Sequence, residues 1–451
     1  MFNMLIISDL KRIWLLMMVL CCGGQHILSA QQYQLPDGKK AEKIRFELLN
    51  NLIIIPLEVN GAKLSFMLDS GVNKPILFNL ADQDSIQLNN VSEVTINGLG
   101  EGEAINALRS HGNQFKLGSI TNSLQELYVV MDSDINFSSS LGIPVHGIIG
   151  FDLFRDFVVE VNYGKQYLKF HDPDEYVYKE KAKTEVLNMS LDGTKAYVKA
   201  NVALENDKKL RVKMLLDTGS SDAVWLFEND SITLPRNNYS DFLGKGLAGD
   251  VYGKRTRLSQ VQIGSFVLND AKAAFPDMSV YDVVKDLGDR NGSFGGGLLK
   301  RFNIIFDYPN KKISLKKNVN FKLPFQYNIS GIDLQHAGVR YVSERITHSN
   351  AVMPEDKTTY GSVQIILQGA TRLSLVPEIV VSGIRAGSPA SSSGLKEGDV
   401  ILAVNGKRIH RYKLQEILQM LNKKKDQRVK VLVSRSNRDL IFSFMLEELF
   451  K

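Results

Sequence analysis

The chain has 451 residues, of which 44% are hydrophobic and 23% are charged; this ordinary globular composition excludes a mainly disordered, collagen-like or coiled-coil protein. At roughly 150 residues per domain, about three domains are expected. The net charge is +6, and no stretch gathers the 55 Lys and Arg residues into a basic face with interleaved aromatics. We therefore expect no nucleic-acid partner.

The cysteines and histidines argue against a metal site. The two cysteines, Cys21 and Cys22, are adjacent and close to the N-terminus. This excludes a disulfide-stapled scaffold and a zinc site built from cysteines. The seven histidines are scattered, and no His-Glu-x-x-His motif occurs. We therefore expect no bound metal.

The N-terminus has the pattern of a secretory signal. Lys11 and Arg12 precede an apolar run from Ile13 to Cys22, and Ala30 ends a small-residue exit. This predicts a signal peptide over residues 1–30 and an exported mature protein. The alternatives to a signal peptide are lipid attachment at one of the two cysteines and a buried N-terminal helix. No other stretch reaches the ~18 apolar residues of a membrane span, so none is expected.

A repeated element appears first between residues 53 and 71. Two apolar, β-branched runs, Ile53–Val59 and Leu64–Leu68, flank Asn60-Gly61, a strong signal for a β-hairpin. Asp69-Ser70-Gly71 follows the second run directly. The sequence thus predicts a strand, a turn and a strand that ends on an Asp-Ser-Gly triplet.

The same element returns about 150 residues later. Ala196–Leu204 and Leu210–Leu216 lead into Asp217-Thr218-Gly219, and an apolar-Gly element follows each triplet. It begins at Ile148 in the first half and at Ser293 in the second, so that Asp69 lies 81 residues before Gly150, and Asp217 lies 78 before Gly295. The short strands with Gly, Asn and Pro between them predict two barrel-like β lobes, at residues 31–172 and 186–317.

These motifs resemble those of the pepsin/retropepsin superfamily of aspartic proteases, over residues 45–317. The resemblance implies a mainly all-β fold with two lobes related by a pseudo-twofold axis. It implies an aspartic-type endopeptidase that hydrolyses peptide bonds in extended polypeptides, with no cofactor and with Asp69 and Asp217 as the catalytic pair. Because both lobes lie in one chain, dimerisation is not required.

Two neighbouring carboxyls suit this chemistry because both cannot ionise, and so they share one proton. The ionised member takes a proton from water, and the protonated member donates one to the scissile carbonyl. Ser220 follows the second triplet, whereas no hydroxyl follows the first; we therefore expect the proton on Asp69 and the base at Asp217. Structural carboxylates at strand ends are the alternative. The residues expected to support the pair are Ser70, Gly71, Thr218, Gly219 and Ser220.

Glycine-rich segments in each half are candidates for flaps that close over a bound peptide. The first half offers Gly98, Gly100 and Gly102, and the second offers Gly244–Gly253 with Tyr252 as a gate. Ordinary turn glycines are the alternative in both cases.

The last third resembles a PDZ domain of the bacterial exported-protease kind, an α+β fold, over residues 325–448. The series that carries the resemblance is Ser388-Pro389-Ala390, Gly394-Leu395, Gly398-Asp399 and Asn405-Gly406. This resemblance implies that the protein is located in the periplasm or cell envelope of a bacterium. We expect a helix at Leu414–Leu421, from apolar residues spaced i, i+3, i+4 and i+7, and an insertion over His336–Pro377. PDZ domains bind extended peptides and their terminal carboxylates; the residues expected to bind such a peptide are Gly331, Ile332, Asp333 and Leu334.

The sequence therefore predicts an exported, two-lobed aspartic endopeptidase whose PDZ domain binds substrate or a C-terminal peptide. The alternative from another class is a catalytically silent peptide-binding adaptor that uses the PDZ groove. A third possibility is that the PDZ domain inhibits the protease until a peptide docks.

Overall fold

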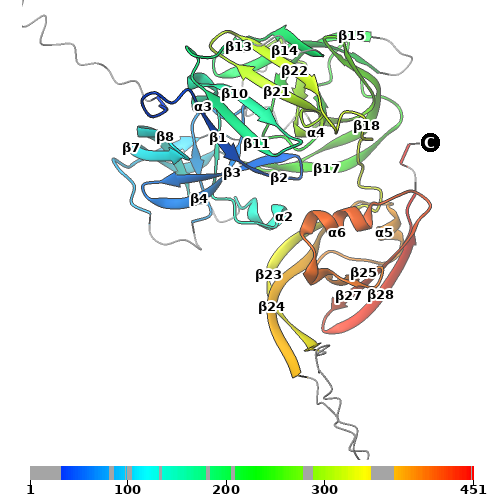
Figure 1. Ribbon diagram of the computed structural model, residues 1–451. Coiled ribbons are helices and arrows are strands. Elements are labelled where there is room, and N and C mark those ends of the chain that lie inside the picture. Colours follow the sequence, from blue (N-terminus) through cyan, green and yellow to red (C-terminus); the bar gives the residue numbers. More distant parts are fainter. Residues whose placement is uncertain are drawn as a thin grey trace, which may run out of the picture.

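A computed structural model shows two β lobes side by side and a C-terminal domain packed below them (Figure 1). The predicted signal peptide and the candidate flap residues Gly100 and Gly102 lie outside the residues that the structure describes. The described residues are 32–80, 86–96, 98, 104–131, 135–178, 183–204, 209–277, 288–346, 370–447 and 449–450.

Lobe 1 is an eight-stranded sheet in the order β2-β3-β4-β9-β5-β8-β7-β6, and a further pairing of β3 with β7 curls it toward a barrel. Asn60 and Gly61, with φ of 48° and 89°, form the predicted tight turn between β3 and β4. The elements are β2 (Glu47–Leu49), β3 (Leu52–Val59), β4 (Ala62–Leu68), β5 (Ile76–Leu77), β6 (Ser92–Ile96), β7 (Ile105–Leu117), β8 (Ile120–Val130), α2 (Ser138–Leu141), β9 (Gly147–Ile149) and α3 (Phe151–Asp156).

Lobe 2 repeats this topology. Its sheet order is β13-β14-β15-β20-β16-β19-β18-β17, with β14 also paired to β18, which matches lobe 1 position by position. The prediction of two related β lobes is therefore confirmed. The elements are β13 (Ser190–Asp192), β14 (Lys195–Ala203), β15 (Lys209–Leu216), β16 (Val224–Leu226), β17 (Asn238–Gly246), β18 (Gly249–Ile263), β19 (Phe266–Pro276), β20 (Gly292–Phe294) and α4 (Gly296–Leu299).

A six-stranded sheet joins the lobes, in the order β1-β11-β10-β21-β22-β12. Its central pair is antiparallel, and it joins β10 of lobe 1 to β21 of lobe 2 from Val158↔Asp307 to Asn162↔Asn303. One buried apolar cluster runs through both lobes, so the hydrophobic effect holds them as one body. The strands are β1 (Ala41–Arg45), β10 (Val158–Asn162), β11 (Tyr167–His171), β12 (Thr184–Asn188), β21 (Phe302–Asp307) and β22 (Lys312–Lys317).

The C-terminal domain is a sheet in the order β23-β24-β25-β27-β28 with its own core, flanked by two helices. The predicted helix at Leu414–Leu421 is confirmed as α6, and Leu414, Ile417 and Leu421 are buried on one face. The elements are β23 (Ile332–Ile346), β24 (Ala370–Ile384), α5 (Pro389–Ser392), β25 (Val400–Val404), β26 (Lys407–Arg408), α6 (Leu414–Leu421), β27 (Arg428–Arg435) and β28 (Arg438–Met445).

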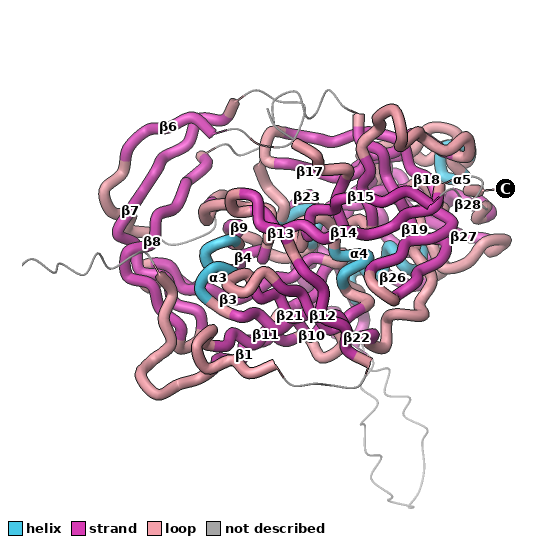
Figure 2. The backbone as a smooth tube through the Cα atoms, turned by 90° about the horizontal axis from the view of Figure 1, so that it is seen from above, coloured by secondary structure: helices cyan, strands magenta, loops and turns pink. Residues whose placement is uncertain are grey.

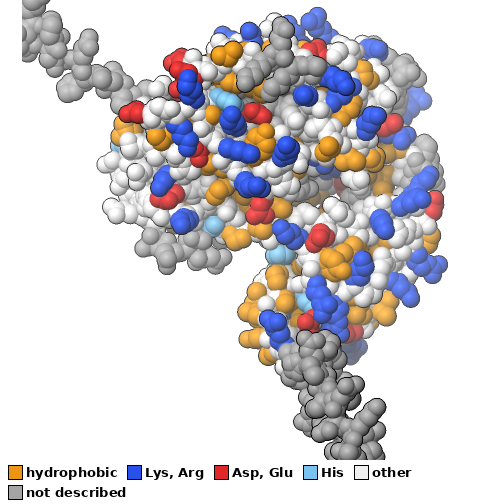
Figure 3. Space-filling view, in the orientation of Figure 1, with side chains coloured by type: hydrophobic (Ala, Val, Ile, Leu, Met, Phe, Trp, Pro, Cys, Tyr) orange, Lys and Arg blue, Asp and Glu red, His pale blue; other side chains and the backbone are white. Residues whose placement is uncertain are grey.

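Part of the insertion expected over His336–Pro377 forms regular secondary structure. Much of it forms the arms of a long hairpin, in which β23 and β24 pair as far as Ile346↔Ala370. Residues 347–369 lie outside the described part. The pairing was missed because several apolar side chains of the arms face solvent, so no buried pattern marks the strands. Figure 3 shows hydrophobic side chains gathered over this region; those exposed are Val339, Tyr341, Leu373 and Leu375.

Two surface properties bear on the predicted partners. Lys and Arg side chains are dispersed over the face seen in Figure 3 rather than gathered on one element. In the described part of the chain, no helix combines the length and the apolar character needed to cross a bilayer.

Candidate active site

Equivalent strand ends in the two lobes place Asp69 and Asp217. Asp69 follows β4, and its amide donates to the Ile149 carbonyl at 2.8 Å; Asp217 follows β15, and its amide donates to the Phe294 carbonyl at 3.0 Å. In each lobe the strand before the Asp runs parallel to the short strand that supplies this carbonyl. The two predicted triplets therefore occupy equivalent positions, each fixed by backbone hydrogen bonds.

The hydroxyls of Ser70 and Thr218 bond the lobes together beneath the two carboxyls. Each hydroxyl oxygen accepts the other residue's amide, at 2.9 Å and 3.0 Å. Each hydroxyl also donates across the lobe boundary, Ser70 to the Leu216 carbonyl at 2.7 Å and Thr218 to the Leu68 carbonyl at 2.8 Å. Both side chains are fully buried, so these bonds are shielded from water and fix the two triplets relative to each other.

The glycines of the triplets bring the two carboxyl groups to one place. The Gly71 amide donates to Asp69 at 2.7 Å, and the Gly219 amide donates to Asp217 at 3.1 Å. A Cβ added at Gly71 would lie 3.1 Å from Asp69 Oδ1 and 3.8 Å from Asp217 Oδ1. A Cβ added at Gly219 would lie 2.3 Å from Asp69 Oδ2. Both carboxyls thus surround the same point, and a side chain at residue 219 would collide with Asp69.

The two carboxyls differ in their electrostatic surroundings. Burial, with the charge of Asp217, raises the pKa of Asp69 to about 7. Burial also raises the pKa of Asp217, but the Arg290 charge, the Gly219 and Ser220 amides and the Lys195 charge oppose that rise. The Gly71 and Gly219 amides and the Lys195 charge also oppose the rise in the pKa of Asp69, so the Arg290 charge and the Ser220 amide are what distinguish Asp217. Ser220 acts through its amide rather than its hydroxyl, and the preference of the proton for Asp69 stays a prediction.

Sequence reasoning missed Lys195 and Arg290. They lie 22 residues before and 73 after Asp217, at the start of β14 and just before β20. No motif marks either residue, and only the folded sheet brings them to the carboxyls.

Parts of this chain are similar to known protein families and to solved structures. Residues 55–153 and 198–298 match the family model described as aspartyl protease, and residues 380–435 match the model described as PDZ domain. Both lobes thus resemble aspartyl protease domains, and the C-terminal domain resembles a PDZ domain, over the matched residues. Among solved structures, the aspartic proteinase from Irpex lacteus is similar with 13% sequence identity and a TM-score of 0.40, over 63% of this chain and 99% of that one.

Residues of the β6–β7 segment of lobe 1 and of the β17–β18 hairpin of lobe 2 line the cavity around the carboxyls, and Gly98 lies against the turn of the lobe 2 hairpin. Gly98, after β6 of lobe 1, is so close to the β17–β18 turn of lobe 2 that an added Cβ would lie 2.6 Å from Leu247 Cβ and 3.0 Å from the Ala248 nitrogen. Farther back on the lobe 2 hairpin, Tyr252 packs on Phe242 with ring centroids 5.6 Å apart. Figure 2 shows β6 and β17 along the same upper edge of the molecule. Gly98 and the lobe 2 hairpin therefore form a paired cover at this side of the cavity.

Gly98→Ala should weaken this cover, because the new methyl group has no room beside Leu247. We expect KM for a peptide substrate to rise roughly fivefold, which corresponds to a loss of ~1 kcal/mol of closure energy. Steady-state kinetics measures the change. Gly164→Ala is the matched control, since its Cβ would meet nothing nearer than 3.6 Å. Equal KM values for the two variants would contradict a role for the tip contact.

A buried charge cluster supports the lobe 2 hairpin. Asp222, three residues after Gly219, accepts from Arg255 at 2.7 Å and from the Trp225 indole at 2.8 Å, and Lys272 lies 3.1 Å from it. These charges hold the pKa of Asp222 far below its usual range, against the effect of burial. Arg255 also bonds Asp241 at 2.5 Å. The cluster therefore ties β17 and β18 to the loop that carries Asp217.

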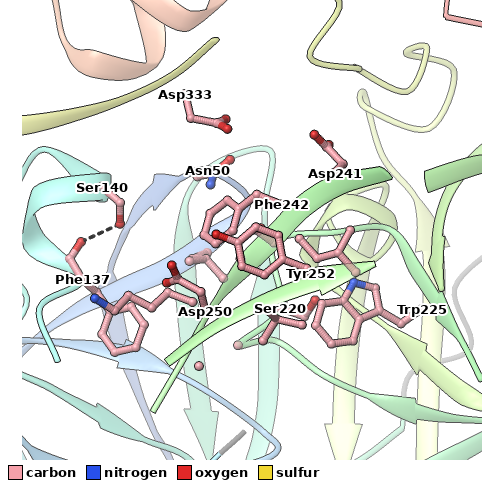
Figure 4. Close-up of a pocket in the computed structure, with 18 of the residues that line it drawn as sticks. Asn50, Phe137, Ser140, Ser220, Trp225, Asp241, Phe242, Asp250, Tyr252 and Asp333 are labelled. Carbon is pink, nitrogen blue, oxygen red and sulfur yellow. Dashed lines mark hydrogen bonds between the residues drawn. The ribbon is translucent and has the colours of Figure 1, made fainter. Parts of the chain in front are cut away.

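A cavity of about 1470 Å³ surrounds the carboxyls and extends to the PDZ domain. Figure 4 shows Ser220, Phe242 and Tyr252 inside it, Phe137 and Ser140 at one side, and Asp241 and the PDZ residue Asp333 at the far side. Among the described residues, no group of His, Cys, Asp and Glu side chains could hold a metal ion.

The predicted peptide-binding residues of the PDZ domain have different environments. Ile332 and Leu334 are buried in the PDZ core, whereas Asp333 lines the cavity. Gly331 has φ of 77°, and an added Cβ would lie 2.2 Å from Ser388 Cβ, so only glycine fits there. Burial, together with the charge of Asp241, raises the pKa of Asp333 to about 6.

Proposed function

We propose that this protein is an aspartic endopeptidase that hydrolyses peptide bonds in extended polypeptides. One observation carries the proposal: two carboxyls from equivalent strand ends surround the same point, and buried hydroxyls lock them there across the lobe boundary. The match of both lobes to the aspartyl protease model also supports this proposal. The cavity beneath the paired hairpins has room for a peptide segment.

In the proposed reaction a water molecule lies between the two carboxyls. Asp217, as carboxylate, removes a proton from the water while the water oxygen attacks the scissile carbonyl carbon. Asp69, as carboxylic acid, donates its proton to the carbonyl oxygen, which gives a neutral tetrahedral diol. Breakdown of the diol cleaves the C–N bond, the amine nitrogen takes up a proton, and the dyad again holds one proton. No cofactor enters this sequence.

A peptide library incubated with the mature protein between acidic and neutral pH tests the proposal. We expect mass spectrometry to find internal cleavage products, and pepstatin, a transition-state mimic of aspartic proteases, to suppress them. Tight binding of peptides without any product would instead favour the catalytically silent adaptor and overturn the proposal.

The pH profile should be bell-shaped with an upper limb near neutrality. Below the pKa of Asp217 both carboxyls are protonated and no base remains; as pH rises through about 7, Asp69 loses its proton and no acid remains. Arg290→Gln should move the acidic limb of kcat/KM to higher pH, because the Arg290 charge lowers the pKa of Asp217. An acidic limb that stays in place would show that this charge does not tune the base.

Export and PDZ ligands are further parts of the proposal. The pattern of residues 1–30 supports export to the periplasm or cell envelope, which N-terminal sequencing of the mature protein would test. The PDZ domain would contact extended polypeptide, either substrate or a C-terminal peptide.

A further inference from the structure

A turn of lobe 1 reaches into the PDZ domain. This turn, Phe137–Gly142, contains α2, and α2 lies beside β23 (Figure 1). β23 is the edge strand of the PDZ sheet, and α6 packs next to it. A PDZ domain binds a peptide by adding it as a strand at such an edge. The turn therefore lies at the domain's own peptide groove.

The contacts place the turn between the strand and the helix. Gln415, in the first turn of α6, donates to the Leu141 carbonyl at 2.9 Å. A Cβ added at Gly142 would lie 3.2 Å from Leu414 Cβ and 3.4 Å from the ring of His336 on β23. A peptide that ran the length of the groove would have to displace Leu141 and Gly142.

At the other end of the groove, the backbone amides already have acceptors. The Ser330 amide donates to Asn422 at 2.8 Å, the Gly331 amide to Asn328 at 2.9 Å, and the Ile332 amide to the Ser330 hydroxyl at 3.3 Å. These are the amides of the loop before β23, where a terminal carboxylate would be captured. A peptide carboxylate would therefore have to replace bonds within the domain.

The opposite side of the PDZ domain is held by lobe 2. The Arg385 guanidinium lies 4.7 Å from the ring centre of Tyr239 and 3.9 Å from Asp241. Near the C-terminus, Phe450 is buried against Tyr239 and Tyr327, with ring centroids 5.7 Å and 5.2 Å away. The PDZ domain thus contacts both lobes, on the two sides of the cleft.

We propose that the PDZ domain is a third wall of the peptide cleft, held in place because the lobe 1 turn occupies the end of its groove. Phe137, Ser139 and Leu141 of the turn line the same cavity as Asp69 and Asp217, and so do PDZ residues from Ser382 to Pro389. Polypeptides long enough to leave the carboxyls and run along this wall gain contacts that short peptides lack. The inference rests on the proposed peptide cleft, but its tests need no catalysis.

A disulfide tests the docked turn directly. Cβ atoms in disulfides are typically about 3.8 Å apart, and a Cβ added at Gly142 would lie 3.2 Å from Leu414 Cβ, so an outward shift of the turn by a few tenths of an ångström allows a bridge. In a background with Cys21 and Cys22 replaced by Ser, Gly142→Cys with Leu414→Cys should cross-link on mild oxidation, seen as a gel shift that dithiothreitol reverses. Failure of the folded double variant to cross-link, with circular dichroism like that of the parent, would overturn the docking.

Peptide binding tests the wall. In an Asp217→Asn background that prevents turnover, fluorescence anisotropy compares two labelled peptides with a shared core, of ~6 and ~16 residues, or roughly 20 Å and 50 Å when extended. We expect the longer peptide to bind about tenfold more tightly. Gly142→Asp, which pushes a carboxylate against Leu414, should abolish that preference and leave the Kd of the short peptide unchanged. Gly38→Asp is the matched control, with φ of 78° against 74° at Gly142 and nothing within 4 Å.

The outcomes separate the inference from the proposed function. No length preference in the parent, or a preference that survives Gly142→Asp, would overturn the third wall even if the protein cleaves peptides. If Gly142→Asp weakened the binding of both peptides equally, the turn would act at the carboxyls, and the third wall would also be overturned. A length preference lost in Gly142→Asp, in a chain that cleaves nothing, would support the wall and refute the protease.

Discussion

Asp217→Asn should lower kcat for a cleaved library peptide by roughly 10³- to 10⁴-fold, toward the upper end of what loss of a general base costs. The amide has the shape of the carboxylate, so it can still accept the Gly219 amide bond, but it cannot take a proton from water. We expect KM to change little, because peptide contacts along the cleft remain. Asp69→Asn should have a comparable effect, since it removes the acid. Single-turnover measurement of product formation gives the rate constant of cleavage for each of the two variants.

Asp230→Asn is the control for this pair, because Asp230 lies on the same lobe with an exposed side chain. The Asp230→Asn variant should cleave the same library peptide at the parental rate. Wild-type kcat in either Asp69→Asn or Asp217→Asn would exclude the shared-proton mechanism, since each variant leaves only one of the two groups that it requires.

Asp222→Ala should destabilise lobe 2 by about 3–5 kcal/mol, the usual result of removing one partner of a buried ion pair. The substitution leaves Arg255 buried and Lys272 partly buried, with Asp241 as the remaining carboxylate of the cluster, and it removes the acceptor of the Trp225 indole. Urea unfolding followed by Trp fluorescence should show the first transition at a clearly lower midpoint. Activity should fall with it, because the same cluster supports the hairpin over the cleft.

The surface pair Lys213–Asp289 provides the control for charge removal. Asp289 has a side chain 78% exposed, so Asp289→Ala should leave the unfolding midpoint unchanged. If Asp222→Ala and Asp289→Ala unfolded at the same urea concentration, the buried cluster would have no structural role.

The sequence was sufficient for the parts of the fold that local patterns encode. Asn60-Gly61 between alternating apolar runs specifies a hairpin, and its copy before Asp217 reveals the duplication. Two triplets whose apolar-Gly partners lie at nearly the same distance, 81 and 78 residues, then identify the strand ends that meet. The spacing of Leu414, Ile417 and Leu421 predicts α6 in the same way.

Contacts between distant segments were beyond this reasoning. Arg290 belongs to no motif, yet its charge lowers the pKa of Asp217, and Gly98 lies against Leu247 of the other lobe only in the folded molecule. The position of the PDZ domain depends on single side chains such as Gln415 and Arg385, which look like ordinary surface residues in the sequence. The pairing register, burial and charge environment of such residues are determined by the tertiary structure and not by local sequence patterns.

The joining of both lobes in one chain removes a constraint that two identical subunits would impose. Twin halves would surround each carboxyl with the same neighbours, so the choice of proton donor would be arbitrary. Here the Arg290 charge, from lobe 2, lowers the pKa of Asp217, whereas the Lys195 charge, also from lobe 2, lowers the pKa of both carboxyls. In a single chain, the roles of acid and base can therefore be assigned to particular carboxyls in the free protein, before a substrate binds.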